Sequence, residues 1–329
     1  MRKIIGIFLA VTLLGGCGSA ARGGHGDTDT CTGTAAHENV GAETSAAPRF
    51  DADSAYAYVK RQVEFGPRVP NTEAHARTAA WLAAELRRHG AQVVEQKADL
   101  KAFDGTVLKM TNIMGSYNPQ ATDRLLLLAH YDTRPWADQD PDAANHSKPI
   151  DGANDGASGV AVLLETARML GAAVTDTGID ILFVDAEDYG TDGDDDSWAM
   201  GARYFAENPI KPGYRPSRAI LLDMVGDADA SFPAEYMSRQ AAPDLDDAFR
   251  AAAQRAGFAD RFPRVMGGAV TDDHVQLIRQ GVPAIDIIDY RPGTGFCPTW
   301  HTLDDNLSNI SRETLRAVGQ SLFEFLNIR

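Results

Sequence analysis

Short, almost wholly apolar runs alternate with amphipathic helical patterns from about residue 50 to the end of this 329-residue chain. Strands are expected at Gln92–Glu95, Asn112–Ser116, Leu125–His130, Ile179–Val184, Ala219–Met224 and Ala284–Ile288. Helices are expected at Asp53–Phe65, Thr72–His89, Ser158–Leu170, Gly201–Glu207, Leu245–Gly257, Asp272–Gln280 and Arg312–Leu326. Strands that are apolar throughout are typical of a sheet covered by helices on both faces. The pattern therefore predicts an α/β fold, a three-layer α/β/α sandwich around a mixed, mostly parallel central sheet.

Residues 1–17 have the composition of an export signal. Arg2 and Lys3 supply positive charge, and Ile4–Leu14 is an apolar run too short to span a bilayer. The following Leu14-Gly15-Gly16-Cys17 resembles a bacterial lipobox, which predicts cleavage before Cys17 and a lipid on its thiol. The alternative is an ordinary signal peptide with a chance cysteine. We expect an exported protein that is lipid-anchored to the cell envelope, on its periplasmic or outer-membrane side.

The rest of the chain divides into a tether and one domain. Residues 18–47 contain few large apolar side chains and cannot bury enough surface to offset the entropy of ordering. They are expected to form a flexible tether. Residues 48–329 have the size of one large α/β domain, and we expect this part to be catalytic.

Charge and cysteine content limit the partners of the chain. Its 46 acidic and 31 basic residues give a net charge of −15, which argues against nucleic acid and anionic lipid as partners. Export permits a disulfide between Cys31 and Cys297, but two cysteines do not make a disulfide framework. A buried thiol is the simpler interpretation of Cys297.

Polar side chains stand at or just after the carboxyl ends of several of the expected strands. Examples are His130, the pair Glu187-Asp188, and Asp223. Further histidines and carboxylates stand in the connecting segments: Asp132, Asp155, Asp272, Asp273, His274 and His301. Each alone is explained by capping, but parallel strands bring their carboxyl ends to one edge, where α/β sheets bind ligands. So much negative charge in one cleft requires a cation, and mixed histidine and carboxylate donors favour zinc over calcium.

The order of these clusters resembles the zinc aminopeptidase superfamily known as M28, from about residue 50 to the C-terminus. A finer pattern is similar to the glutaminyl cyclases of that superfamily. It comprises Gly-Ala-Asn154-Asp155, Asp272-Asp273-His274 and Trp300-His301-Thr302-Leu303-Asp304-Asp305-Asn306. The insert Arg134-Pro-Trp136-Ala-Asp138-Gln-Asp140-Pro-Asp142 resembles the bacterial branch. The resemblance implies an aminopeptidase-like fold and conversion of the N-terminal glutamine of peptides or proteins to pyroglutamate, with release of ammonia.

The resemblance also implies a metal centre and a proton carrier. Asp155, Asp188 and His301 would bind one zinc ion per chain, and Glu187 would be the general acid and base. Asp188 stands where the animal cyclases have a second glutamate. Because aspartate is shorter by one methylene, we expect either a closer backbone or a different binding mode at that position.

The same resemblance implies a substrate pocket beside the metal. Asp223 and Asp272 would form an adjacent pair of carboxylates that shares a proton, because two neighbouring buried carboxylates resist double ionisation. Trp300, Phe296 and Trp198 would form the walls of the pocket for the glutamine side chain. The expected partners are peptides or proteins with N-terminal glutamine, and a monomer is expected.

A di-zinc aminopeptidase is the alternative enzyme. It uses two zinc ions to activate water, and its ligand set would be His130, Asp155, Asp188, Asp223 and His301. All five residues are present, so ligand identity leaves this alternative open. The aromatic residue before the late histidine and the Asp272-Asp273-His274 run favour the cyclase. A non-catalytic binding lipoprotein is disfavoured because Glu187 and His301 are both retained.

The acidic segment Thr191–Asp196 superficially resembles a calcium-binding loop. It lacks the spaced ligands and the closing bidentate glutamate of an EF-hand. We therefore expect a solvated loop near the mouth of the site.

Overall fold

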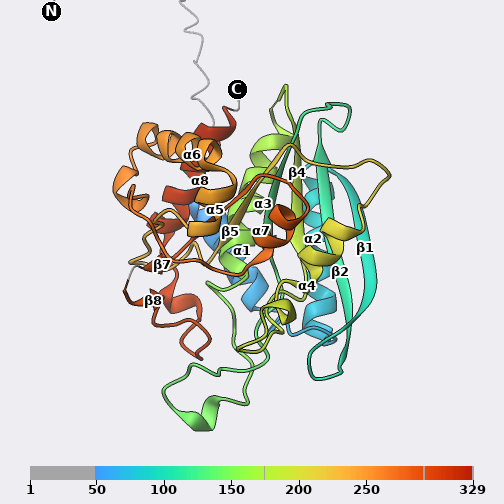
Figure 1. Ribbon diagram of the computed structural model, residues 1–329, viewed down its shortest axis with the longest axis vertical. Coiled ribbons are helices and arrows are strands. Elements are labelled where there is room, and N and C mark those ends of the chain that lie inside the picture. Colours follow the sequence, from blue (N-terminus) through green and yellow to red (C-terminus); the bar gives the residue numbers. More distant parts are fainter. Residues whose placement is uncertain (1–48, 174, 292, 328–329) are drawn as a thin grey trace, which may run out of the picture. The chain divides into compact units, whose positions relative to one another are not determined.

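The computed structural model describes residues 49–173, 175–291 and 293–327 (Figure 1). Its main sheet has six strands in the order β1-β2-β4-β3-β5-β6. Their bounds are β1 Gln92–Lys101, β2 Val107–Tyr117, β3 Arg124–His130, β4 Gly178–Val184, β5 Arg218–Asp223 and β6 Ala284–Ile288. The expected export signal (1–17), the tether (18–47) and Cys31 lie outside the described residues.

The sheet is mixed and mostly parallel, as predicted. β3 pairs in parallel with β4 and β5, and β5 pairs in parallel with β6. β2 runs antiparallel to both β1 and β4, and β1 forms one edge of the sheet (Figure 1). β1 and β2 extend beyond the predicted runs because buried or half-buried residues alternate with exposed, mostly polar ones in their outer halves, which only a half-covered edge tolerates.

Helices cover both faces of the sheet, which confirms the three-layer sandwich. Side chains on β3 point alternately to two cores. Leu127 faces a core formed with α1, α2, α3, α6 and α8, whereas Leu128 faces α4 and α7. The bounds are α1 Ala52–Val63, α2 Glu73–Arg88, α3 Ala157–Gly171, α4 Met200–Glu207, α6 Pro243–Arg255, α7 Asp273–Arg279 and α8 Arg312–Leu326.

Capping residues fix several helix ends. Thr72 caps α2 by accepting a hydrogen bond from the backbone N–H of His75, and Ser311 caps α8 in the same way. α5 (Tyr236–Ala241) was not predicted because six residues are too few to show a helical period. A short hairpin of β7 (Tyr290–Arg291) and β8 (Gly295–Phe296) was also missed. In the described part of the chain, every helix is too short or too polar to cross a membrane.

Candidate metal centre and active-site pocket

Asp155, Asp188 and His301 form a compact, buried group at the carboxyl edge of the sheet. His301 Nε2 lies 3.1 Å from Asp188 Oδ1 and 3.6 Å from Asp155 Oδ2. Neither carboxylate oxygen of Asp188 accepts a hydrogen bond from the described residues. Burial of a carboxylate without hydrogen bonds is costly, so the group is suited to a cation, and its mixed donors suit zinc. The shorter side chain of Asp188 therefore does reach the other two donors.

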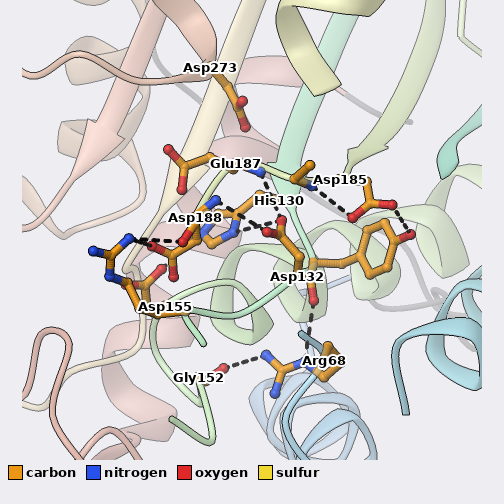
Figure 2. A network of polar contacts seen from close by, with 12 residues as sticks. Arg68, His130, Asp132, Gly152, Asp155, Asp185, Glu187, Asp188 and Asp273 are labelled. Carbon is orange, nitrogen blue, oxygen red and sulfur yellow. Dashed lines mark hydrogen bonds and ion pairs between the residues drawn. The ribbon is translucent and has the colours of Figure 1, made fainter. Parts of the chain in front are cut away.

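Asp155 also belongs to a second group, with His130 and Asp223. His130 Nε2 lies 3.0 Å from Asp155 Oδ1 and 3.2 Å from Asp223 Oδ1. Oδ1 of Asp155 thus faces His130, and Oδ2 faces His301. Figure 2 shows His130 between Asp155 and Asp132. The structure therefore brings together all five side chains of the alternative two-metal ligand set.

Strained backbone turns present these side chains to the sheet edge. Ala186, Met224 and His301 have positive φ angles of 53°, 47° and 54°, a conformation that non-glycine residues rarely adopt. Each costs on the order of 1 kcal/mol or more, and such strain gathers at functional sites. Gly156, at φ 93°, is required next to Asp155, because an added Cβ would lie 2.7 Å from the carbonyl oxygen of Asp132.

Two buried side chains hold the loop that carries Asp155. Arg68 donates to the carbonyl oxygens of Tyr131, at 3.3 Å, and Gly152, at 2.6 Å. Asp305 accepts the backbone N–H of Asp155 at 3.1 Å. The loop is thereby tied both to the end of β3 and to the segment that follows His301. Figure 2 shows Arg68 beside this loop, with Gly152 as its partner.

Asp132 holds the acidic pair that follows β4. Its two carboxylate oxygens accept the backbone N–H groups of Glu187 and Asp188, each at 3.2 Å. Its Oδ1 also lies 3.6 Å from His130 Nδ1. Asp132 therefore positions the backbone of both acidic residues as well as facing the imidazole.

Asp138 is a functional candidate that the sequence interpretation missed. Its Oδ1 lies 3.3 Å from His301 Nδ1, on the far side of the ring from the metal group. Arg134 holds Asp138 with Nε at 3.0 Å and Nη2 at 2.5 Å, and also donates to the carbonyl oxygen of Asp188 at 3.1 Å. A carboxylate behind a metal-binding imidazole fixes its tautomer and orientation. In the sequence the insert marks the bacterial branch of the family, and spacing within it gives no indication of this contact.

Replacement of Asp138 by asparagine is expected to weaken zinc binding by about 10- to 100-fold, because the orienting charge behind His301 is lost. Competition with a chelator of known affinity measures the change. Replacement of Asp142 by asparagine in the same insert is the control, since that side chain only caps a short turn. Equal zinc affinity in the Asp138 and Asp142 variants would contradict the role of Asp138.

A cavity of about 310 Å³ opens over the metal group. Asp155, Asp188 and His301 all line it, together with Glu187. Aromatic rings form much of the rest: Trp198, Tyr290, Phe296 and Trp300. The His301 ring is nearly parallel to two of them, with centroids 3.8 Å from Trp300 and 6.1 Å from Trp198. The three predicted wall residues therefore lie around one pocket.

The remaining predicted site residues line the same cavity. Burial raises the pKa of Glu187 well above its ordinary range; the positive charge of His130 opposes this, and the charge of Asp272 adds to it. Burial raises the pKa of Asp223 to about 7, although its hydrogen bond with His130 opposes the shift. The charge of Asp272 again adds to it. Asp223 and Asp272 thus affect each other electrostatically, but no hydrogen bond joins them among the described residues.

A further acidic cluster lies behind the pocket, at the start of α7. Burial raises the pKa of Asp273 well above its ordinary range, and Figure 2 shows this side chain above Glu187. His274 faces Glu235 at 3.1 Å and Asp286 at 3.7 Å. Asp286, inside β6, and Glu235, at the cap of α5, were not predicted as polar partners. An aspartate in an otherwise apolar strand was the available signal for Asp286.

The acidic loop lies where the sequence interpretation expected it. Asp192, Gly193 and Asp195 are exposed and line the same cavity. The rim of the pocket is therefore negatively charged, which attracts cationic groups.

Comparison with known proteins agrees with this geometry. Residues 112–326 match peptidase family M28. The crystal structure of Porphyromonas gingivalis glutaminyl cyclase is 50% identical, with a TM-score of 0.84, over 85% of this chain and 99% of that chain. The chain belongs to peptidase family M28 and, within it, to the glutaminyl cyclases. This confirms the predicted family and its aminopeptidase-like fold.

A solved exopeptidase and a cyclotransferase from a snake are also similar to this chain. A Zn-dependent exopeptidase from Parabacteroides distasonis is 50% identical, with a TM-score of 0.83, over 85% of this chain and 98% of that chain. The glutaminyl-peptide cyclotransferase of Boiga irregularis is 26% identical over 255 residues. That alignment covers 66% of this chain and 66% of the Boiga enzyme, just under two thirds of each.

Proposed function

We propose that the chain is a glutaminyl-peptide cyclotransferase that uses one zinc ion per chain. One observation carries the proposal, namely the composition of the pocket. It brings the Asp155, Asp188 and His301 group together with Glu187 under a wall of aromatic rings. His130 of the second group is only 1% exposed and is not among the described residues that line the cavity. Of these two groups, the one formed by Asp155, Asp188 and His301 has all three side chains at the cavity and is therefore accessible to substrate.

The reaction closes a ring within the substrate. The α-amine nitrogen of the N-terminal glutamine forms a bond to its own side-chain carbonyl carbon, and the bond to the amide nitrogen breaks. Asp155, Asp188 and His301 would hold a zinc ion, which would supply Lewis-acid polarisation of that carbonyl. No second reactant is needed, so the main task of the pocket is to fold the glutamine side chain back onto its amine and to exclude water.

Glu187 is assigned the proton transfers. It takes a proton from the attacking amine and delivers one to the leaving nitrogen, so that ammonia departs and the carboxylate is restored. A raised pKa makes Glu187 a stronger base than an exposed glutamate, which suits it to both steps. Asp223 and Asp272 are assigned to orient the amine beside it, with at least one of them protonated near neutral pH.

The alternative is a di-zinc aminopeptidase, and the second group favours it. His130, Asp155 and Asp223 come close enough together to hold a second cation. In that case water would be the nucleophile and the scissile bond would be the first peptide bond of the substrate. The two reactions give different products from different substrates.

The test is an assay of the purified full-length chain with glutamine-initiated peptides and with leucine anilide. Zinc is measured in the same sample. Ammonia release with a matching mass loss from the peptide, at about one zinc per chain, would support the proposal. Cleavage of leucine anilide at two zinc ions per chain, without ammonia release, would make the aminopeptidase assignment correct.

Zinc affinity is expected to rise with pH. Burial alone would lower the pKa of His301, but the charge of Asp188 and the hydrogen bond with Asp138 raise it to about 9. Below that pH the imidazole of the metal-free protein carries a proton that zinc must displace. Affinity should therefore increase by about tenfold per unit between pH 6 and pH 8, when measured by chelator competition. An affinity that does not change over this interval would contradict the assignment of His301 as a ligand.

We propose that the chain is anchored by lipid at Cys17. The basic residues, the short apolar run and the lipobox-like Leu14–Cys17 support this. Replacement of Cys17 by serine is expected to move the protein from the membrane fraction to the soluble fraction of the expressing bacterium. An unchanged distribution of the Cys17→Ser variant would contradict the lipid anchor.

A further inference from the structure

Asp185 follows β4 directly, and its fully buried carboxylate has four polar partners. Oδ1 lies 2.8 Å from His75 Nε2 and accepts the backbone N–H of Ala186 at 2.7 Å. Oδ2 accepts the backbone N–H of Thr111 at 2.7 Å and the hydroxyl of Tyr131 at 3.0 Å. Together these partners compensate the burial of a charge in the interior. The role of this carboxylate is therefore structural, two residues before Glu187.

Asp185 and Asp132 interlock the ends of β3 and β4. Asp132, after β3, accepts the backbone N–H groups of Glu187 and Asp188. In return Asp185, after β4, accepts the hydroxyl of Tyr131. Figure 2 shows Asp185 to the right of Asp132, on the side away from Asp155. The acidic pair is thus held directly by Asp132 and, through Ala186, indirectly by Asp185.

Ala186 is the strained link between Asp185 and the acidic pair. It has φ 53° and is fully buried, and its N–H is fixed by the carboxylate of Asp185. Non-glycine residues keep such a conformation only where their surroundings impose it. If the carboxylate of Asp185 rotates, the turn loses this constraint, and Glu187 and Asp188 lose their direction toward the pocket.

His75 contributes the only imidazole among the four partners that fix the rotation of that carboxylate. It stands in the first turn of α2, where Thr72 caps the helix and accepts the backbone N–H of His75 at 3.2 Å. Its ring is stacked on Tyr131, with centroids 5.3 Å apart and an angle of 13° between the planes. The ring is therefore held on one face by Tyr131, and its Nε2 lies 2.8 Å from Asp185 Oδ1 and 3.1 Å from the hydroxyl of Tyr131.

We propose that His75 is a positioning residue for the reaction. Through Asp185 it fixes the turn at Ala186 that presents Glu187 and Asp188 to the substrate and the metal. His75 itself is not among the described residues that line the cavity, so it acts on the substrate and the metal only through Asp185 and Ala186. The kinetic part of the inference rests on the proposed function, whereas its effect on Asp188 can be measured as zinc affinity alone.

The test compares three variants of the full-length chain. His75→Ala removes the hydrogen bond to Asp185, and His75→Gln keeps a donor at a similar distance from the backbone. His89→Ala is the matched control, because His89 ends the same helix, is also buried, and lies 3.0 Å from the hydroxyl of Tyr58. For each variant we would measure kcat and KM for a glutamine-initiated peptide, zinc affinity by chelator competition, and Tm.

His75→Ala is expected to lower kcat and zinc affinity by about 10- to 100-fold, with KM changed less than threefold. His75→Gln should restore most of the loss, and His89→Ala should lower Tm to a similar extent with kcat unchanged. The inference is overturned if His75→Ala and His89→Ala have the same kcat and zinc affinity, or if His75→Gln restores neither. If the unchanged protein releases no ammonia, the proposed function fails, and the zinc affinities still decide the role of His75.

Discussion

Replacement of Glu187 by glutamine is expected to lower kcat for ammonia release by about 10²- to 10⁴-fold, while KM and zinc content stay close to those of the unchanged protein. Glutamine has nearly the same shape as glutamate, so the pocket keeps its form. The glutamine side chain can neither take a proton from the attacking amine nor return one to the leaving nitrogen. The loss should therefore fall on the chemical step alone.

The environment of Glu187 makes this effect large. Burial and the charges of Asp272 and Asp188 raise its pKa, although His130 opposes them, so the side chain is a stronger base than a solvated glutamate. Glu187 lies in the cavity beside the metal group, and its backbone is fixed by Asp132. No other glutamate among the described residues lines that cavity, so another carboxylate of the same length cannot take its place.

The matched control is Glu165→Gln, because Glu165 is also fully buried but belongs to α3, away from the pocket. It accepts the backbone N–H of Asp51 at 3.1 Å and pairs with Arg168. We expect this variant to lose stability, seen as a lower Tm, with kcat unchanged. If Glu187→Gln retains more than about a tenth of wild-type kcat, a different group carries the proton.

The sequence was sufficient to predict the fold because the chain obeys simple periodic rules. Strands such as Leu125–His130 and Ile179–Val184 are almost wholly apolar because helices cover both faces, and helix α8 begins and ends where its pattern predicts. The outer half of the β1–β2 hairpin was missed because its exposed face is polar. Residues 236–241 were missed because α5 is shorter than two turns.

The site was predictable where chemistry coincides with a strand end. His130 and Asp223 are the last residues of buried strands and the Glu187-Asp188 pair stands just after another, and the rule that parallel strands end at one edge brings them together. The partners that orient them were not predictable. Asp138 reaches His301 from an irregular insert, and His75 reaches Asp185 from a helix that reads as an ordinary amphipathic one. Such contacts depend on tertiary placement, for which sequence spacing contains no rule.

Replacement of His301 by alanine is expected to remove the zinc ion and to lower kcat by at least about 10³-fold, since polarisation of the carbonyl by the metal contributes several kcal/mol. Metal content of the dialysed protein and ammonia release are the measurements. Because the His301 ring is stacked on those of Trp300 and Trp198, its truncation also disturbs the aromatic wall. Asp188→Asn, which keeps the shape of the side chain, should give the same loss of zinc without that disturbance.

His130→Ala separates one metal from two. Under the one-zinc proposal it removes a hydrogen-bond partner of Asp155 and Asp223 but no ligand, so the variant should still bind one zinc ion and keep measurable ammonia release. Asp155 cannot make this distinction, because it belongs to both groups and its loss would disrupt either arrangement. If His130→Ala instead lowers the zinc content from two ions to one and abolishes activity as fully as His301→Ala, both groups are metal sites. The one-zinc proposal would then be wrong, and water activated between two metal ions would become the better mechanism.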